Sequence, residues 1–252
     1  MSESNSPLLW TLVAAVFTLG GFVKGVVGLG LPTITMGLLS VVMLPAQAAA
    51  LLFVPSLVTN LWQIGGPGFV MVCRRLFGML AGVCAGVALG AGWLSGGGGW
   101  ASMALGVALV VYAVLGLLHW RLQVRPALEP WLGPVVGVST GLVTAATGVF
   151  VIPAVPYLQA LGLEKDELVR ALGLSFLVST IALGASLGAG GALQASALLG
   201  SAIAVLPALF GMGIGQWLRG RVRAETFKTI FFAGLLALGV YLVLRGAWRL
   251  FA

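Results

Sequence analysis

Residues 8–43 read LLWTLVAAVFTLGGFVKGVVGLGLPTITMGLLSVVM, an apolar run that glycines and a proline interrupt in its middle. A membrane-spanning helix needs about 20 mostly apolar residues, so this run is too long for one crossing and too short for two full ones. Residues 131–162, WLGPVVGVSTGLVTAATGVFVIPAVPYLQALG, show the same pattern. Because proline and glycine interrupt helices, each run predicts a helix that is broken or folded into a hairpin.

The composition of the whole chain places these runs in a membrane. Of the 252 residues, 60% are hydrophobic and 8% are charged, whereas soluble domains carry roughly 25% charged residues. The sequence therefore predicts an all-α polytopic membrane protein with roughly eight to ten crossings and no room for a separate catalytic domain. The other apolar runs have the length of ordinary membrane helices and lie at 47–66, 76–94, 101–120, 168–189, 193–218 and 226–251.

The two halves of the chain resemble each other. Glycines recur at matching places in both, and so do a leucine and two polar residues of the following run. This predicts a duplication into transmembrane repeats at 1–122 and 131–252, joined by a linker at about 121–130, with about four helices each. The matched positions are Gly21, Gly25, Gly30, Leu44, Ser56, Asn60, Gly86 and Gly90 in the first half and Gly137, Gly141, Gly148, Leu163, Ser175, Ser179, Gly211 and Gly215 in the second.

Lysine and arginine favour cytoplasmic loops and so distinguish two topologies. If each long run crosses once, the cations of the loops divide evenly between the two sides. If each long run enters and returns as two short arms, the second half is inverted and the cations gather on one side. This bias favours inverted pseudo-two-fold repeats, in which many secondary transporters place a central site. The gathered cations are Arg74, Arg75, Arg121, Arg125, Lys165, Arg170, Arg219, Arg221, Arg223 and Lys228, with Arg245 and Arg249 opposite.

The middle of the first long run has the features of an anion site. Lys24 and nearby glycines lie beside the expected helix break, where exposed N–H groups and the positive end of the next half-helix attract negative charge. In the second half Thr144, Thr147 and Gly148 take the equivalent place, with hydroxyls instead of a cation. The alternative for Lys24 is a simple kink with a lysine that extends toward the membrane surface.

Two later helices add polar side chains. Helical spacing puts Ser56 and Asn60 on one face, and Ser175 and Ser179 on the equivalent face of the second half. In lipid these groups point inward, either to a substrate or to neighbouring helices. Arg170 is either a loop charge or a second cation for the anion. The predicted substrate-binding residues are Lys24, Gly25, Gly28, Gly30, Ser56, Asn60, Thr147, Gly148, Ser175, Ser179 and Arg170.

The acidic residues lie outside the apolar runs. Cation transporters and proton relays carry buried acids in their helix bundles, so the cargo is expected to be anionic or neutral. The net charge of +7 is spread in short clusters between apolar runs. That distribution suits a lipid bilayer with anionic headgroups and does not predict a nucleic-acid partner.

Catalytic and metal signals are weak. Cys73 and Cys84 are the two cysteines, too few for a disulfide framework or a four-ligand metal site, and no cofactor is implied. Residues 137–141 spell G-x-S-x-G, but they lie inside an apolar helical run without a strand-to-helix turn or a base. His119 stands at the end of a run, where an interfacial residue is expected. The chain is therefore not expected to be an enzyme.

Residues 21–30, GFVKGVVGLG, followed by LPAQA at 44–48, resemble the opening of the sulfite exporter TauE/SafE family, also called the toluene-sulfonate uptake permease family. Residues 141–153 and 161–165 resemble the second repeat of that family. The resemblance implies a bacterial inner-membrane permease for sulfite, organosulfonates or related sulfur oxyanions. It places the glycine-rich repeat openings at Gly25, Gly28, Gly30 and Gly148. The second opening departs from the family pattern, because residues 149–151 are VFV instead of glycines.

Together these features predict a permease that binds a small anion near the midplane, between two broken helices, and works by alternating access. A non-transporting scaffold or assembly subunit is the first alternative, and an anion channel is the second. A scaffold predicts Lys24 and Asn60 buried against protein, whereas a permease predicts that they line a wet cavity. The sequence leaves open whether the chain forms a homo-oligomer.

Overall fold

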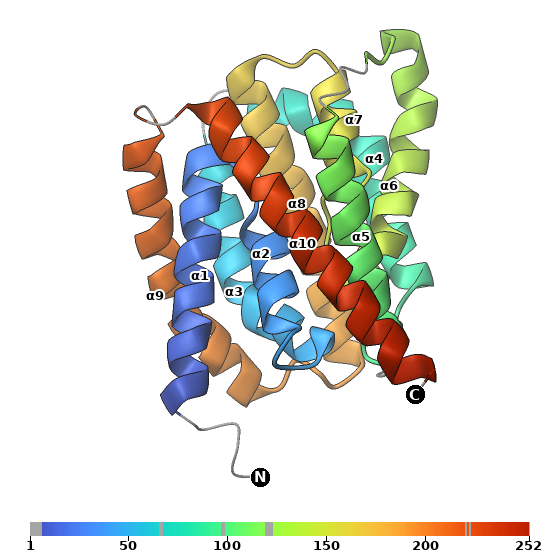
Figure 1. Cartoon of the computed structure of the whole chain (residues 1–252). Coiled ribbons are helices and arrows are strands. Elements are labelled where there is room, and N and C mark those ends of the chain that lie inside the picture. The colour runs from blue at the N-terminus through green and yellow to red at the C-terminus, as the bar shows by residue number, and fades with distance from the viewer. Residues whose placement is uncertain are drawn as a thin grey trace.

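The computed structural model describes residues 7–65, 68–96, 99–118, 123–219, 221 and 223–251, and these residues form a helical bundle (Figure 1). His119, which the sequence suggests is an interfacial residue, and Arg121, which it suggests is a loop cation, lie outside the described residues. In chain order the helices are α1 (Pro7–Val27), α2 (Leu31–Leu39), α3 (Pro45–Ile64), α4 (Phe69–Leu89), α5 (Gly99–Leu117), the short 3-10 helix η1 (Pro126–Leu128), α6 (Glu129–Thr147), α7 (Ala154–Ala160), α8 (Lys165–Ala189), α9 (Ala195–Leu218) and α10 (Ala224–Phe251).

The helices confirm the predicted fold class. Within the described residues seven helices are long and apolar enough to cross a membrane, namely α1, α3, α4, α5, α8, α9 and α10. Many large apolar side chains face outward, among them Phe77, Leu206 and Phe210. A helix surface of this kind is stable in lipid, where there is no cost of exposing hydrocarbon to water. The chain is an integral membrane protein.

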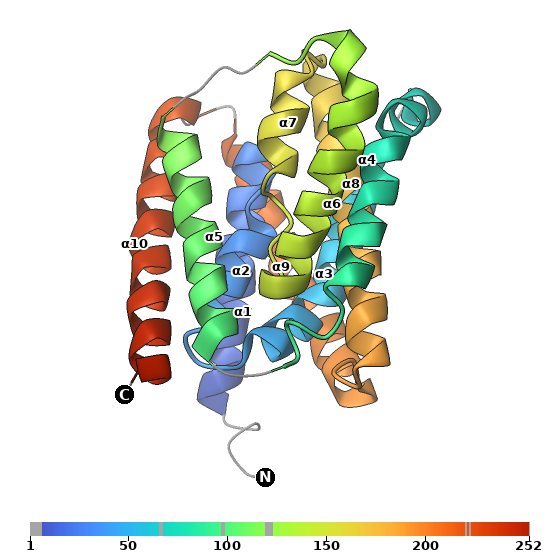
Figure 2. The same cartoon turned by 90° about the vertical axis from the view of Figure 1, so that its right-hand side faces the viewer.

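Both long runs are broken, as predicted. The first divides into α1 and the nine-residue α2, and the second into α6 and the seven-residue α7. In Figures 1 and 2, α1 rises and α2 returns downward, whereas α6 descends and α7 returns upward. Each long run is therefore a hairpin with one long and one short arm.

The hairpins set the direction of the other helices. In the same views α3, α5 and α9 rise, and α4, α8 and α10 descend. The start of α4, the start of α8 and the loop between α9 and α10 therefore lie at one end of the bundle, and α10 ends at the other. Of the cations that the second topology gathers on one side, these segments carry Arg74, Arg75, Lys165, Arg170, Arg219, Arg221 and Arg223.

Two element boundaries differ from the prediction. Helix α4 begins at Phe69, seven residues before the predicted run, and thus includes Arg74 and Arg75. Helix α6 begins at Glu129, inside the predicted linker. In both cases charged residues were interpreted as loop. They belong to the first two turns of helices, because helices in this protein extend beyond the apolar part of the run.

Glycines bring two pairs of helices into backbone contact. Helix α1 packs along α9, and α6 packs along α4. A Cβ atom added to Gly211 of α9 would lie 2.0 Å from the carbonyl oxygen of Thr18, and one added to Gly137 of α6 would lie 2.1 Å from that of Met79. No side chain fits in these places. Small residues at helix contacts allow backbones to approach this closely in a membrane.

The glycine contacts show the register of α4 against α6 and of α9 against α1. A Cβ on Gly86 of α4 would lie 2.2 Å from the carbonyl oxygen of Val138 on α6, and a Cβ on Gly215 of α9 would lie 2.1 Å from that of Phe22 on α1. In these contacts Gly86 occupies on α4 the place that Gly215 occupies on α9. The sequence matched Gly86 with Gly211 and Gly90 with Gly215, and these matches differ from the packing by one helical turn. Because glycines recur every four residues along α4, their spacing alone does not fix the register.

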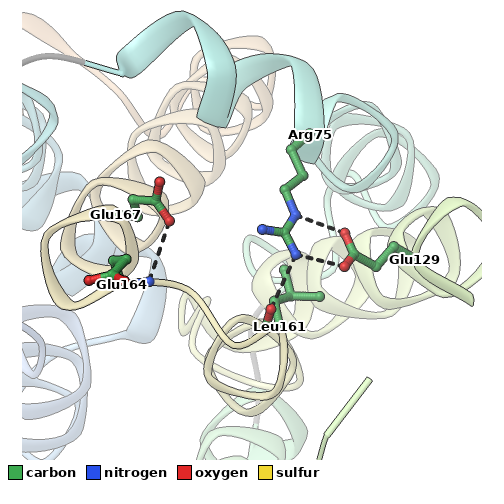
Figure 3. Close-up of polar contacts among 5 residues, drawn as sticks. All are labelled: Arg75, Glu129, Leu161, Glu164 and Glu167. Carbon is green, nitrogen blue, oxygen red and sulfur yellow. Dashed lines mark hydrogen bonds and ion pairs between the residues drawn. The ribbon is translucent and has the colours of Figure 1, made fainter. Parts of the chain in front are cut away.

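Both short helices end against an arginine. The guanidinium group of Arg75 on α4 donates two hydrogen bonds to the carboxylate of Glu129, at 2.9 and 2.7 Å (Figure 3). It also donates to the carbonyl oxygen of Leu161, just after α7, at 3.1 Å. At the other end of the bundle, Arg245 of α10 donates to the carbonyl oxygen of Val41, just after α2. Cations are favourable at helix C-termini, where carbonyl groups lack helical partners. These contacts tie each short arm to a long helix.

The glycine contacts give a stability prediction. Gly211→Ala forces α1 and α9 apart, and overpacking of this kind costs about 1–3 kcal/mol. We expect the midpoint of thermal aggregation of the detergent-purified protein, followed by size-exclusion chromatography, to fall by several degrees. Gly213→Ala is the matched control, because no atom lies within 4 Å of a Cβ at this position of the same helix. Equal midpoints for the two variants would contradict the packing.

Candidate anion-binding site

The first helix break is built by two glycines. Helix α1 ends at Val27, and Gly28 (φ 84°) and Gly30 (φ 117°) adopt left-handed conformations that other residues rarely take. Gly28 closes the last turn of α1 by donating to the carbonyl oxygen of Lys24 at 2.7 Å. Gln63 of α3 donates from Nε2 to the carbonyl oxygen of Gly28, also at 2.7 Å. The break is therefore held from α3.

Backbone donors are left over at this break. Within the described residues the N–H groups of Leu29, Gly30 and Leu31 have no hydrogen-bond acceptor. All three residues are buried. Pro32 has no N–H group, and helix α2 starts with its positive end at this point. Unpaired donors at a helix N-terminus form an environment that favours an anion.

Lys24 lies at the centre of the site. Its side chain is 2% exposed, and its ammonium group donates to Thr59 Oγ1 at 3.0 Å and to Asn60 Oδ1. Both acceptors are neutral, so these contacts leave the positive charge uncompensated. An unpaired charge in the interior is costly, and a nearby anion would interact with it strongly because the dielectric constant there is low.

Hydrogen bonds continue from Lys24 across the bundle. Asn60 donates from Nδ2 to Ser56 Oγ at 3.1 Å, and Ser56 Oγ lies 3.0 Å from Thr180 Oγ1 of α8. All four side chains are nearly fully buried. This series of hydrogen bonds thus connects the first hairpin with both central helices, α3 and α8.

At the second break a threonine hydroxyl bonds to the neighbouring backbone. Gly148 (φ 71°) ends α6, and the hydroxyl of Thr147 donates to the carbonyl of Val143 at 2.7 Å and accepts from the N–H of Val149 at 3.1 Å. The hydroxyl of Thr147 is therefore occupied by its own backbone. A Cβ on Gly148 would lie 2.5 Å from the side chain of Met36, so this break packs against α2.

The structure brings some of the predicted residues together and separates others. Lys24, Ser56 and Asn60 share one network, with Gly28 and Gly30 beside it. The hydroxyls of Ser175 and Ser179 are buried in α8 without a hydrogen-bond partner among the described residues. Gly25 instead faces α9, where a Cβ would lie 2.3 Å from the carbonyl oxygen of Met212.

Arg170 lies in the second turn of α8, and its side chain is half-buried. The sequence interpretation left out Thr59 and Thr180, which both join the network. The i, i+4 spacing selected Ser56 and Asn60. Thr59 lies on the same face, three residues after Ser56, so helical spacing could have identified it as a further candidate.

A cavity of about 490 Å³ adjoins the first break. Val27 and Leu29 line it from the break, Val155 and Pro156 line it from α7, and further walls come from α5 and α10. Lys24 and Asn60 do not line this cavity; in this conformation they are buried against protein. The criterion that a permease exposes both residues to a wet cavity is therefore not met in this state.

The arrangement as a whole is that of a polytopic membrane protein with a buried cation at a helix break. The model of the sulfite exporter TauE/SafE family matches residues 12–242. The chain belongs to this family, which implies a membrane permease for sulfur-containing anions rather than an enzyme. The search of curated proteins and the search of solved structures each gave no match.

The contacts of Lys24 give a test by double substitution. Asn60→Leu leaves the buried ammonium with one acceptor fewer, which costs about 1–3 kcal/mol or more, and we expect a lower midpoint in the thermal assay. Adding Lys24→Met removes the charge and should recover most of that loss. If the double variant is as unstable as the sum of the two single changes, Asn60 does not stabilise the charge. Lys165→Met, an exposed cation of α8, is the control and should leave the midpoint unchanged.

Proposed function

We propose that this protein carries a small sulfur oxyanion, such as sulfite or an organosulfonate, across the bacterial inner membrane by alternating access. The uncompensated ammonium of Lys24 beside the first break is the observation that carries the proposal. Membership of the family gives the class of cargo, and the site gives the chemistry that would bind it. The anion would accept from the ammonium and from the N–H groups of the break, which are charge-assisted and therefore strong hydrogen bonds.

The hydroxyls of α3 and α8 would complete the site. Ser175 and Ser179 are buried donors without a partner in the described chain, and Ser56 and Asn60 already join the network of Lys24. Oxyanions have several acceptor positions, so several donors from different helices suit them. Thr147 and Gly148 would contribute backbone geometry at the second break, and Arg170 would contribute charge at the start of α8. Gly25 would support the site through its contact with α9.

We further propose that residues 1–122 and 131–252 are inverted structural repeats. Three observations support this relation. The α6–α7 hairpin runs opposite to the α1–α2 hairpin (Figures 1 and 2). Helix α1 packs on α9 as α6 packs on α4, and the remaining long helices pair α5 with α10 and α3 with α8. Inverted repeats supply two alternative packings of similar energy, which is the physical basis of alternating access.

In this scheme the conformation described here has a closed site. Lys24 and Asn60 are sealed by protein, and the cavity reaches Val27 and Leu29 at the break. Movement of one hairpin would open a path between the cavity and the ammonium. The scaffold alternative requires instead that Lys24 stays buried in every state, and the channel alternative requires a continuous open path.

The proposal predicts flux that depends on Lys24. Proteoliposomes that contain the protein should take up radiolabelled sulfite, and Lys24→Met should reduce the uptake at least about tenfold, because a charge-assisted hydrogen bond is lost. Lys165→Met should retain the rate of the unmodified protein. Unlabelled sulfite inside the vesicles should accelerate the entry of the label, as expected for a carrier that returns loaded.

Three results would contradict parts of the proposal. Equal uptake by empty and protein-containing vesicles would remove transport and favour the scaffold. Normal uptake by Lys24→Met would remove the role of the ammonium. Uptake that internal sulfite does not accelerate would favour the channel over alternating access.

A further inference from the structure

We infer that Ser201 of α9 is a positioning residue for the anion site. Its hydroxyl bridges the gap that Pro55 leaves in the hydrogen bonds of α3. Through this gap Ser201 holds Thr59 and Asn60, the two acceptors of Lys24, in place. This inference rests on the proposed function and deepens it, because it assigns part of the affinity for the anion to a residue outside the site.

The gap follows from the chemistry of proline. Pro55 lies inside α3 and has no N–H group, so the carbonyl group of Leu51, four residues earlier, loses its helical donor. Ser201 supplies the missing donor, because its Oγ donates to the carbonyl oxygen of Leu51 at 2.8 Å. The same Oγ accepts from the N–H group of Val54 at 2.9 Å. The side chain of Ser201 is fully buried, so a hydroxyl of α9 completes a turn of α3.

The acceptors of Lys24 lie just beyond this gap. Thr59 and Asn60 follow Pro55 by about 6 and 7.5 Å along the helix axis. The hydroxyl of Thr59 donates to the carbonyl oxygen of Pro55 at 2.7 Å, which leaves its oxygen free to accept from Lys24. Helices bend most readily at proline. A change of about ten degrees at the gap would move both acceptors by about 1 Å, enough to lengthen or break a hydrogen bond.

Helix α9 also fixes the helix that carries the cation. A Cβ on Gly25, the residue after Lys24, would lie 2.3 Å from the carbonyl oxygen of Met212 on α9. The backbones of α1 and α9 therefore touch at the level of Lys24. Because Ser201 ties α3 to the same helix, α9 sets the position of the ammonium group and the position of its acceptors.

This arrangement makes the affinity for an anion depend on Ser201. Without its hydroxyl the direction of α3 beyond the gap is no longer fixed, and the ammonium group of Lys24 shifts with its acceptors or loses them. An anion would then no longer meet the ammonium and the N–H groups of Gly30 and Leu31 in one geometry. A serine with only a structural role would lower stability and leave the affinity of each folded molecule unchanged.

Direct binding tests the inference. The protein is purified by size-exclusion chromatography, placed in phosphatidylcholine nanodiscs and dialysed against radiolabelled sulfite, so that the dissociation constant refers to folded molecules. Ser201→Ala should raise this constant about tenfold, the effect of losing about one hydrogen bond to a charged group. Ser196→Ala changes an exposed serine of the same helix and should bind like the unmodified protein.

A second substitution tests the bridge itself. Pro55→Ala restores an N–H group that can bond to the carbonyl oxygen of Leu51 within α3. In this background Ser201→Ala should change the dissociation constant less than about twofold, because the gap no longer exists. The midpoint of thermal aggregation gives the same comparison without a ligand. Ser201→Ala should lower it in the presence of Pro55 and leave it nearly unchanged in the presence of the alanine.

An unchanged dissociation constant in Ser201→Ala would overturn the inference, even if the thermal midpoint falls. Equal effects of Ser201→Ala with and without Pro55 would overturn it as well, because the hydroxyl would then not act through the gap. These outcomes are distinct from failure of the transport proposal. A protein that binds sulfite without carrying it fails the flux test and leaves the comparison of dissociation constants intact.

Conversely, normal flux together with unchanged binding in Ser201→Ala would keep transport and remove the role of Ser201.

Discussion

A buried ammonium group held by two neutral oxygens is the interaction on which the site depends. Lys24 donates to Thr59 and Asn60, both on α3, and neither acceptor carries a charge. Because an uncompensated charge in the bundle interior is costly, such a residue is retained where its charge has a use. The unpaired N–H groups of the neighbouring break add partial positive charge at the same place. A negatively charged solute would reduce both costs, so the feature that lowers stability is also the one to which we attribute the proposed affinity for an anion.

Glycine determines where this ammonium lies. Close contacts through Gly137 and Gly211 press the long arms of the two hairpins against α4 and α9, and Gly28 and Gly30 then turn the chain back after α1. The short arm α2 thereby starts inside the bundle, where its unpaired amides are shielded from lipid. Irregular backbone at this depth is tolerated only inside protein or along a cavity. The packing and the break are thus two parts of one arrangement.

The sequence predicted the broken runs and the membership of Lys24, Ser56 and Asn60 in one polar region. These features follow from composition, length and helical spacing, which are local properties. The register of α4 against α6 could not be predicted from the sequence, because glycines every four residues allow several registers. In the structure Gly86 is the glycine that contacts the backbone of Val138. Nor did the sequence show that Thr147 bonds to its own backbone or that Gly25 faces α9. The rotation of a helix about its axis depends on its neighbours, and an apolar run contains little information about it.

The position of a bound anion tests the account most directly. Selenite has the charge and shape of sulfite, and its selenium scatters anomalously, so a crystal of the protein grown with selenite would locate it without ambiguity. The account predicts an anomalous peak beside the first break, with selenite oxygens at about 2.7–2.9 Å from Lys24 Nζ, the usual length of a charge-assisted hydrogen bond, and within reach of the N–H groups of Gly30 and Leu31. A peak elsewhere in the bundle, with Lys24 still bonded only to Thr59 and Asn60, would contradict it.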